Sequence, residues 1–414
     1  MLRCVRIGAK WERMGQVASI GTPIRDAALP AVWRRSLGVQ AVACFAVARL
    51  ISMSVMAALA GRDPLSRRLG SWDGGYYLRI ARTGYPRALP HVPGKPSRVA
   101  FFPVYPSLIR VAHWFVPGSA LVAAVAVSLM AGLVAAGLIA VLTERVLLPL
   151  VDPVTARRAA LIVVAAWSVE PASFVLSMAY SEAVFTALAA GCLLALVARH
   201  WWTAGVLALF AGATRPTGIV LAGCCAVAAA GELSAWRDRD RSASAARPAV
   251  VLFAATGLAP LGAVAFIVWI GRRIGHPDAW FVAQRQGWQV YTDGGRYVVQ
   301  KVAQYARHPA ARPSGLAVIA VLVAALVLTV LMLRDRPPLV LSGYALALVV
   351  LTLIVHGAFG SIPRFLLPAF PLLLPVGTRA ARLPTTVLVG AFAVAAVAVG
   401  LAAKWVTGQS VLPP

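Results

Sequence analysis

The sequence predicts an all-α protein, a polytopic transmembrane helical bundle. Hydrophobic residues make up 60% of the 414-residue chain and charged residues only 13%, and the mean hydropathy is +0.79. Apolar runs of roughly 17 to 25 residues, the length that crosses a bilayer as a helix, recur to the C-terminus. The short alternating segments that a transmembrane β-barrel needs are not seen. We therefore expect about eleven spans, within a range of roughly nine to twelve.

The basic balance of the chain points to a membrane setting rather than to nucleic acid. Lysine and arginine number 39 against 14 acidic residues, which gives a net charge of +25. The basic residues lie between apolar runs and not along one soluble face, so we expect no nucleic-acid partner. They are typical of topology signals and of attraction to anionic lipids of the bilayer. The heavy use of Ala, Arg, Val and Gly indicates a GC-rich bacterial genome of actinobacterial type.

Basic residues also orient the predicted spans. The first segment, 1–35, carries one lysine and six arginines against two acids, and a basic flank of this kind stays in the cytoplasm. The chain then crosses the membrane at about 36–60 and emerges outside. Each short loop predicted on the inner side carries arginine. We therefore expect a multi-pass protein of the inner (plasma) membrane with a cytoplasmic N-terminus.

One transmembrane domain is expected, over residues 36–404. Two long segments interrupt it on the extracytoplasmic side, 61–118 and 271–313, and long loops are largely exempt from the positive-inside rule. The aromatic and apolar residues of the first segment, broken by prolines, are typical of short helices that lie in the membrane interface. Residues 405–414 are expected to form an extracytoplasmic tail.

The first long segment contains the stretch in which we expect the reaction centre. Ser71–Tyr85, SWDGGYYLRIARTGY, carries one carboxylate, Asp73, beside two glycines. Glycines let a backbone approach closely, and an ionisable residue at a membrane boundary is a candidate functional residue. The alternative is that Asp73 caps a helix that begins at Gly74. Aromatic rings face lipid or a sugar, and those expected to bind substrate are Trp72, Tyr76, Tyr77 and Tyr85.

Further polar residues fall on the predicted outer face. Two acids and a tyrosine lie at the turn of a helical hairpin over 159–198, one arginine interrupts the apolar run 203–231, and another lies in 361–371. The residues expected to bind substrate are Glu170, Tyr180, Glu182, Arg215 and Arg364. A guanidinium fork suits a phosphate. The alternatives are acids solvated at a turn and arginines that snorkel to lipid headgroups.

No group of residues has the spacing of a metal site. Of the five cysteines, four lie in apolar runs and one near the N-terminus, and none has metal-ligand spacing. We predict no obligatory metal or cofactor, while a need for a divalent cation stays open. The sequence has no P-loop or Rossmann fingerprint, so a cytoplasmic nucleotide-sugar donor is not supported.

The whole motif resembles a known family. The pattern W-D-x-x-x-[FY]-x-x-I-A-x-x-G-Y, followed by A-F-F-P-x-x-P, is similar to that of the PIG-V family, the GPI mannosyltransferase 2 type. The matching residues are Trp72, Asp73, Tyr77, Ile80, Ala81, Gly84 and Tyr85, then Ala100, Phe101, Phe102, Pro103 and Pro106. Tyr180-Ser181-Glu182 and the arginine of 361–370 also resemble that family.

The resemblance implies a GT-C fold, a lipid-linked sugar donor and transfer on the extracytoplasmic side, with Asp73 acting in catalysis. Two departures concern the acceptor. Eukaryotic members of the family usually carry His at the position of Tyr76. They also have an acidic residue shortly after the Gly-Tyr pair, where this chain has Pro86 and Arg87. A bacterial member would not build a GPI anchor, so its acceptor must differ.

The resulting hypothesis is a transferase that moves a sugar from a polyprenyl phosphate to a hydroxyl of the cell envelope. The resemblance to the family implies that this sugar is mannose. Asp73 would be the general base, and attack opposite the phosphate would invert the anomeric centre. The acceptor stays open between a glycolipid, a polysaccharide and a protein. The rival hypotheses are a transporter or lipid flippase, which internal repeats and charges at mid-membrane would favour, and a non-catalytic partner of an envelope-assembly complex.

Overall fold

The computed structural model describes residues 31–61, 64–90, 94–237, 246–307 and 313–408. The rest of the predicted N-terminal segment and of the predicted tail lies outside this described part. Within it the protein is all-helical, and its only β-pairing is an isolated antiparallel bridge between Thr292 and Val355. The predicted all-α class is therefore confirmed.

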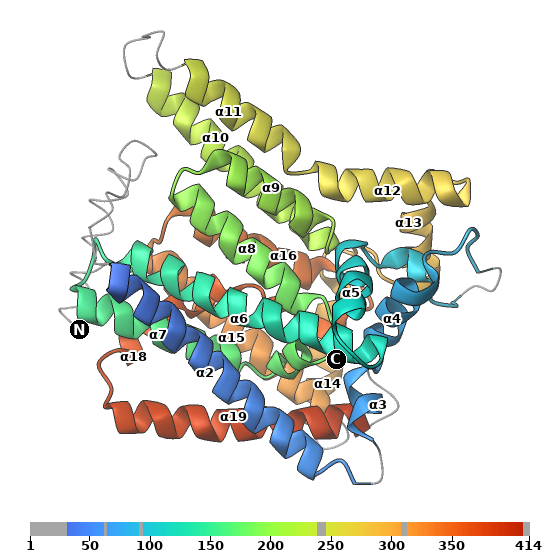
Figure 1. Ribbon diagram of the computed structural model, residues 1–414, viewed down its shortest axis with the longest axis horizontal. Coiled ribbons are helices and arrows are strands. Elements are labelled where there is room, and N and C mark those ends of the chain that lie inside the picture. Colours follow the sequence, from blue (N-terminus) through green and yellow to red (C-terminus); the bar gives the residue numbers. More distant parts are fainter. Residues whose placement is uncertain (1–30, 62–63, 91–93, 238–245, 308–312, 409–414) are drawn as a thin grey trace.

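The helices follow one another with short connections (Figure 1). The α-helices are α2 (Ala31–Ala58), α3 (Leu65–Leu69), α4 (Asp73–Thr83), α5 (Val104–Phe115), α6 (Ala120–Leu147), α7 (Pro153–Ser168), α8 (Glu182–Val197), α9 (Trp201–Gly212), α10 (Ile219–Arg237), α11 (Ala246–Leu258), α12 (Leu261–Ile274), α13 (Ala279–Val282), α14 (Arg296–Arg307), α15 (Pro313–Asp335), α16 (Leu339–Ile354), α17 (Ile362–Leu366), α18 (Leu374–Ala380) and α19 (Thr385–Gly408). The tighter or wider turns are η1 (Arg98–Ala100), η2 (Ser173–Ser177), η3 (Pro216–Gly218), the π-helical η5 (Ala283–Trp288), η7 (Phe359–Ser361) and η8 (Phe370–Leu373).

Within the described residues, six helices are long and apolar enough to cross a membrane. They are Ser36–Ala58, Ala120–Leu147, Pro216–Ser234, Val251–Ile274, Ser314–Asp335 and Thr385–Thr407. A seventh is added if Phe359–Leu366 and Phe370–Ala380, bent by 73°, count as one span, and α8, α9 and α16 are shorter apolar helices. The chain is a multi-pass membrane protein, and the expected count of about eleven spans stays a prediction.

Several turns meet at one end of the bundle, which we call the loop end; it carries α3, α4, α5 and α13, at the right of Figure 1. The turn before α8 reaches it, because Ala179 N donates to Leu69 O (2.9 Å). The turn after α9 reaches it through Val104 N and Ala213 O (3.1 Å). The predicted hairpin over 159–198 and the break at Arg215 are therefore both present.

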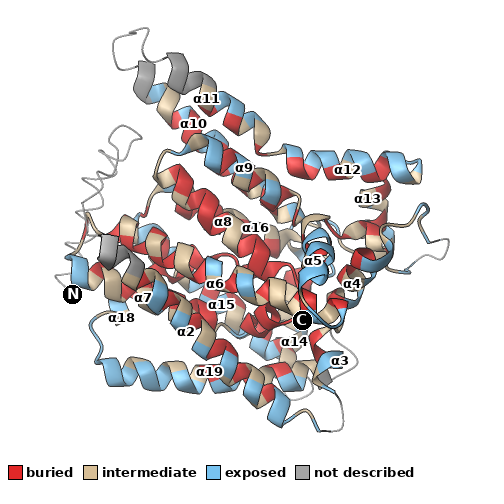
Figure 2. Ribbon diagram, in the orientation of Figure 1, coloured by how far each residue is buried: buried red, intermediate tan, exposed pale blue. Residues whose placement is uncertain are grey.

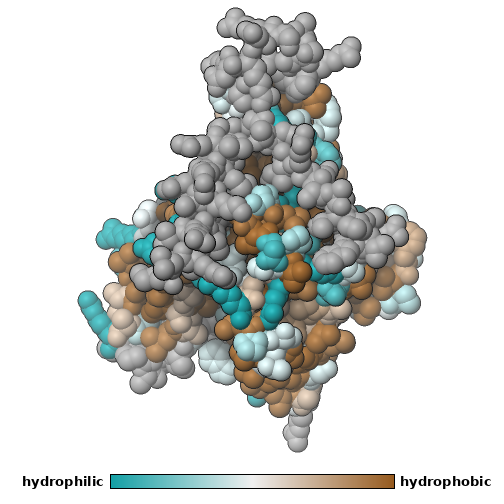
Figure 3. Space-filling view, turned by 90° about the vertical axis from the view of Figure 1, so that its left-hand side faces the viewer, coloured by the Kyte–Doolittle hydropathy of each residue, from teal (hydrophilic) through white to brown (hydrophobic). Residues whose placement is uncertain are grey.

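The opposite end gathers the arginines that the sequence assigns to inner loops. Arg379 pairs with Asp335 at 2.6 Å, and Arg158 donates to Thr385 at 3.3 Å. Figure 3 views the molecule from this side, and in the coloured part of the view hydrophilic side chains lie among hydrophobic ones. Arginines gathered at one end and long loops at the other agree with the positive-inside pattern. Which end faces the cytoplasm stays a prediction.

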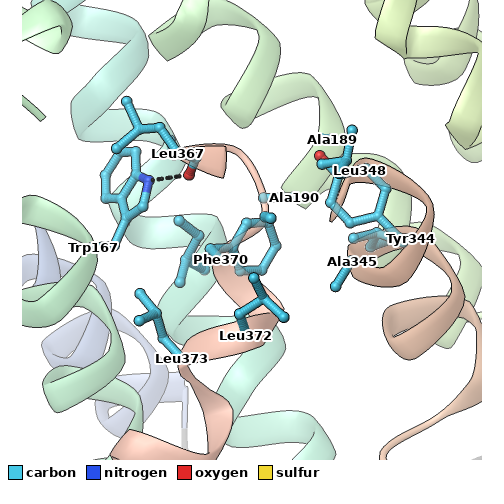
Figure 4. Close-up of a cluster of buried hydrophobic side chains, with 14 of the residues drawn as sticks. Trp167, Ala189, Ala190, Tyr344, Ala345, Leu348, Leu367, Phe370, Leu372 and Leu373 are labelled. Atoms are coloured by element: carbon cyan, nitrogen blue, oxygen red, sulfur yellow. Dashed lines mark hydrogen bonds between the residues drawn. The ribbon is translucent and has the colours of Figure 1, made fainter. Parts of the chain in front are cut away.

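A non-helical break between α17 and η8 is held in the centre of the bundle. Its backbone carbonyls lack helical partners, and buried carbonyls need hydrogen bonds. Trp167 Nε1 donates to Leu367 O (3.1 Å), and Tyr344 Oη donates to Pro368 O (3.2 Å). Figure 4 shows the indole of Trp167 on this carbonyl, with Phe370 beside it. This packing fixes the segment that carries Arg364.

Burial differs between helices in a way that fits a bilayer (Figure 2). Helix α8 is buried along most of its length at the centre of the bundle. The span of α19 is only 22% buried and lies at an edge. The exposed apolar side chains of α19 are suited to lipid contact. Helix α19 also runs to Gly408, so the predicted tail from residue 405 begins as helix.

Small residues let α9 approach the α11–α12 turn closely, as is typical of membrane helix interfaces. A Cβ on Gly262 would lie 1.8 Å from Leu209 O. We therefore expect Gly262→Ala to lower the stability of the bundle by about 1–3 kcal/mol, measured as thermal or denaturant unfolding in detergent. Gly257→Ala is the matched control, because a Cβ there meets nothing within 4 Å. Equal effects of the two substitutions would contradict this account of the interface.

Candidate active site

Asp73 is the first residue of α4 and faces into the bundle. Trp72 precedes it with a φ of 51°, a positive value that is rare for a side chain of this size. Such a sharp entry turns the carboxylate inward, and the partial positive charge at the start of a helix favours it there. The alternative prediction, that Asp73 caps a helix from Gly74, is wrong, since the helix begins at Asp73 and the carboxylate pairs with Arg364 instead.

Four charged side chains form a cluster around Asp73, and we call it the ion-pair cluster: Asp73, Glu182, Arg215 and Arg364. Arg364 donates to Asp73, and its Nε lies 3.4 Å from Glu182 Oε1. Arg215 NH1 lies 2.6 Å from the same oxygen. The exposed fractions of these side chains are 16%, 0%, 12% and 9% in the order given. Two carboxylates and two guanidiniums therefore share a nearly dry site.

The second carboxylate of the ion-pair cluster, Glu182, stands at a helix start like the first, because it begins α8. Both of its oxygens are buried, and within the described chain neither has a hydrogen bond of good geometry. Buried polar atoms usually have such a partner. Oε1 is held by the two guanidiniums, while Oε2 has no partner among the described residues.

Aromatic and hydroxyl groups complete the walls of the site. The Arg364 guanidinium lies over the Tyr180 ring at 5.2 Å and over Phe365 at 5.2 Å. Tyr77 Oη and Ser181 Oγ are 2.8 Å apart, and Arg215 NH1 donates to Ser181 Oγ at 3.2 Å. Of the predicted residues, Tyr77 and Tyr180 thus join the cluster. Ser181 and Phe365 were not predicted to bind substrate, although Ser181 lies in the Tyr180-Ser181-Glu182 stretch that resembles the family; the sequence signal for Phe365 is its adjacency to Arg364.

Three other predicted aromatic residues lie beside the cluster rather than in it. Tyr76 stacks on Phe101 at 5.1 Å and meets Trp288 edge-on at 5.0 Å. Tyr85 donates from its hydroxyl to Phe101 O at 2.7 Å. Trp72 packs against the main hydrophobic core. Tyr76 is one helical turn beyond Asp73, so it is the best placed of the three to meet a substrate.

The structure does not bring Glu170 into the cluster, which corrects its grouping with Glu182. In the described chain it makes no ion pair with either arginine of the site. It belongs to the turn after α7, where Ser173 N donates to its carbonyl (2.8 Å) and Arg49 donates to Ser168 O and Ser173 O. Desolvation raises the pKa of Glu170 well above its usual value.

An Asp–His pair ties the second long segment to the chain just before η7 and α17. His356 Nδ1 lies 3.0 Å from Asp293 Oδ2, and the imidazole stacks on the Tyr291 ring at 4.4 Å and meets the tilted Tyr297 ring at 4.3 Å. Asp293 also accepts from two backbone N–H groups. Eight residues after His356 comes Arg364, so this tether helps to place the arginine of the site.

Stability of this tether should depend on pH. Desolvation raises the pKa of Asp293, but hydrogen bonds from His356 and from the Tyr297 and Gly295 N–H groups outweigh it, so the pKa lies below its usual value. A carboxyl of this kind stabilises the fold above its unfolded pKa of about 3.9, and loses that contribution as pH falls through the folded pKa. We expect Asp293→Asn to lower the thermal midpoint at pH 7, with the difference shrinking toward pH 3. A difference that is the same at both pH values would contradict this.

No group of three or more His, Cys, Asp and Glu residues is arranged to hold a metal ion in the described part of the chain. The ion-pair cluster contains only two such residues, and both are paired with arginine. The absence of an obligatory metal stays a prediction.

Comparison with known proteins decides the family. A family model described as Mannosyltransferase (PIG-V) matches residues 28–257, which is more than half of the chain. The chain belongs to the PIG-V family. The resemblance inferred from the Asp73 motif is thus confirmed, and the matched range contains Asp73, Glu182 and Arg215 but ends before Arg364.

One solved structure also resembles this PIG-V family member. It is the crystal structure of ArnT from Cupriavidus metallidurans bound to undecaprenyl phosphate, with a TM-score of 0.49 and 16% sequence identity. The match covers 85% of this chain and 62% of that chain, so this protein spans less than two thirds of the length of ArnT. No curated protein sequence matches significantly.

Proposed function

We propose that this PIG-V family member transfers mannose from a polyprenyl-phosphate donor to a hydroxyl of a cell-envelope acceptor on the extracytoplasmic face. The observation that carries the proposal is the Asp73 carboxylate, held by Arg364 beside Glu182 and Arg215 at the loop end of a membrane-spanning bundle. A lipid-linked sugar has its reacting carbon at the membrane surface. A nearly dry, charged site at one end of the spans suits that chemistry.

The reaction needs a base more than it needs an acid. A sugar on a polyprenyl phosphate already has a good leaving group. The acceptor oxygen attacks the anomeric carbon while the bond to the phosphate oxygen breaks, and the acceptor proton passes to Asp73. General base catalysis of this kind is worth about 10²–10⁴-fold. Attack from the face opposite the phosphate inverts the anomeric centre.

The arginines of the ion-pair cluster orient the carboxylates. Arg364 spans both Asp73 and Glu182, so it fixes the distance between the proposed base and the second acid. A planar guanidinium with five donors is suited to this bridging role. We infer that Glu182 binds a second hydroxyl of donor or acceptor, and the partnerless Oε2 supports this role.

The acceptor belongs to one of three classes: a glycolipid, a polysaccharide or a protein. Tyr76 and the Pro86-Arg87 pair stand where eukaryotic members of the family usually differ. Tyr76 lies on α4 one turn from the proposed base, and Pro86-Arg87 follow the far end of that helix, so these positions are the first place to look for acceptor selectivity.

One experiment separates a transferase from a flippase or transporter. Purified protein in vesicles is given polyprenyl-phosphate-[³H]mannose, or GDP-[³H]mannose, with a membrane extract as acceptor source. We expect label from the polyprenyl donor, and not from the nucleotide sugar, to appear in a new covalent product. Movement of the intact labelled lipid between leaflets without a new product would show a flippase and overturn the proposal.

A further inference from the structure

The ion-pair cluster does not supply spare positive charge for a phosphate. Its two guanidiniums are matched by two carboxylates, and Arg364 and Arg215 both lie against Glu182. A lipid-linked sugar nevertheless brings a phosphate into this region. Cations that are not already neutralised must therefore be sought nearby.

One face of α4 leads from Asp73 to such cations. Tyr76, Arg79 and Thr83 follow one another at spacings of three and four residues, which places them on one face of the helix. Arg98, from η1, joins this face, because its NH1 donates to Thr83 Oγ1 at 2.7 Å and to Gly84 O at 3.2 Å. Arg79 is the sixth residue after Asp73, a rise of about 9 Å along the axis.

Neither Arg79 nor Arg98 is neutralised by an acid in the described chain. Arg79 is exposed, and its side chain makes no ion pair or hydrogen bond there; only its backbone carbonyl accepts, from Thr83 Oγ1 at 2.9 Å. Arg98 donates only to uncharged oxygens. Partial burial, and then the charge of Arg79, lower the pKa of Arg98. Two cations held close enough to repel are ready to receive an anion, which would relieve the repulsion.

An aromatic wall borders these arginines on the side of Asp73. Tyr76 packs against Phe101 and Trp288, and Trp288 Nε1 donates to Ser97 O (3.1 Å), the residue before Arg98. Aromatic faces are suited to sugar rings, and guanidinium forks to phosphates. From Asp73 outward, α4 thus presents a carboxylate, an aromatic ring and Arg79, and Arg98 of η1 is bonded to Thr83 at its end.

We propose that Arg79 and Arg98 bind the phosphate of a lipid-linked substrate whose sugar lies along Tyr76 toward Asp73. This inference rests on the proposed glycosyl transfer and adds to it the side chains that hold the phosphate. The phosphate belongs either to the polyprenyl donor or to a phosphoglycolipid acceptor, since both present the same group at the membrane surface.

The test measures binding without any need for transfer. Purified protein in neutral detergent is titrated with farnesyl phosphate, with lysophosphatidylinositol and with farnesol, and thermal stabilisation gives an apparent Kd for each. We expect Arg79→Gln and Arg98→Gln to weaken binding of a phosphate probe about tenfold or more, the range for a charged hydrogen bond. Farnesol should show no difference. Arg307→Gln, at an exposed arginine of α14, is the matched control and should bind as wild type does.

The outcomes assign the source of the phosphate. A loss confined to farnesyl phosphate assigns the site to the donor, and a loss confined to lysophosphatidylinositol assigns it to the acceptor. Lysophosphatidylglycerol that competes as well as either probe would show a site for bulk headgroups and would overturn the proposal. Unchanged binding in both variants, or no binding of either probe to wild type, would overturn it too. If the wild type transfers sugar but binds neither phosphate probe, the phosphate site at Arg79 and Arg98 is overturned and the proposed function is not. If the wild type binds a phosphate probe but transfers no sugar, the proposed function is overturned and the phosphate site is not.

Discussion

Asp73→Asn is expected to reduce transfer of mannose by about 10²–10⁴-fold while the protein stays folded. The amide keeps the shape of the carboxylate and an oxygen that accepts from Arg364, but it cannot take the acceptor proton. The measurement is a single-turnover rate with labelled polyprenyl-phosphate-mannose, taken beside the thermal midpoint of each variant. Asp278→Asn is the matched control, because Asp278 is an exposed carboxylate of the second long segment.

A wild-type rate in Asp73→Asn would remove this residue as the base. Glu182 would then be tested next, since it is the other carboxylate of the ion-pair cluster. A large fall in thermal midpoint with Asp73→Asn would also weaken the catalytic interpretation, because the loss of rate would then follow from lost structure. Unchanged binding of farnesyl phosphate by the variant separates these cases.

Arg364→Gln is expected to cost both stability and activity. The substitution leaves Asp73 unpaired and Glu182 with Arg215 alone, and Glu182 is fully buried. Removing one partner of a buried pair costs about 3–5 kcal/mol. Unfolding in detergent measures the stability, and transfer measures the loss of orientation at Asp73. Arg364→Lys keeps the charge without the fork, so it should retain part of the stability and little of the rate.

Two controls make this prediction sharp. Arg379→Gln removes an arginine from an ion pair at the opposite end whose arginine is 39% exposed, and such a pair is worth about 0–1 kcal/mol. Glu182→Gln combined with Arg364→Gln removes one of the stranded acids and should recover part of the lost stability. The buried-cluster account is contradicted if Arg364→Gln lowers stability no more than Arg379→Gln does. It is also contradicted if the double variant loses more stability than the sum of the two single losses.

Much of the fold follows from composition and spacing. Apolar runs predict the spans, and the acidic turn and the Thr-Arg-Pro break predict the ends of α7, α8, α9 and α10. The number of spans is harder to predict. Helices such as α8 and α16 are apolar but short, and many of their side chains are buried, so a length criterion taken from the bilayer does not identify them.

The site was predicted in part. Asp73 stands out because it is an isolated acid in an aromatic, glycine-rich stretch at a membrane boundary. Its partner Arg364 is 291 residues away, and their meeting depends on the break that Trp167 and Tyr344 hold in place. Local spacing carries no signal for such a contact. Glu170 was grouped with Glu182 because both flank one turn, but the turn is long enough for them to part.

The central claim is that the ion-pair cluster is a site of glycosyl transfer from a lipid donor. The most direct measurement gives wild type and Asp73→Asn, in vesicles, polyprenyl-phosphate-[³H]mannose and a membrane extract, and follows label into a new product. The account predicts a labelled product with inverted anomeric configuration from wild type only. Equal product from both proteins, or a product that retains the configuration of the donor, would contradict it.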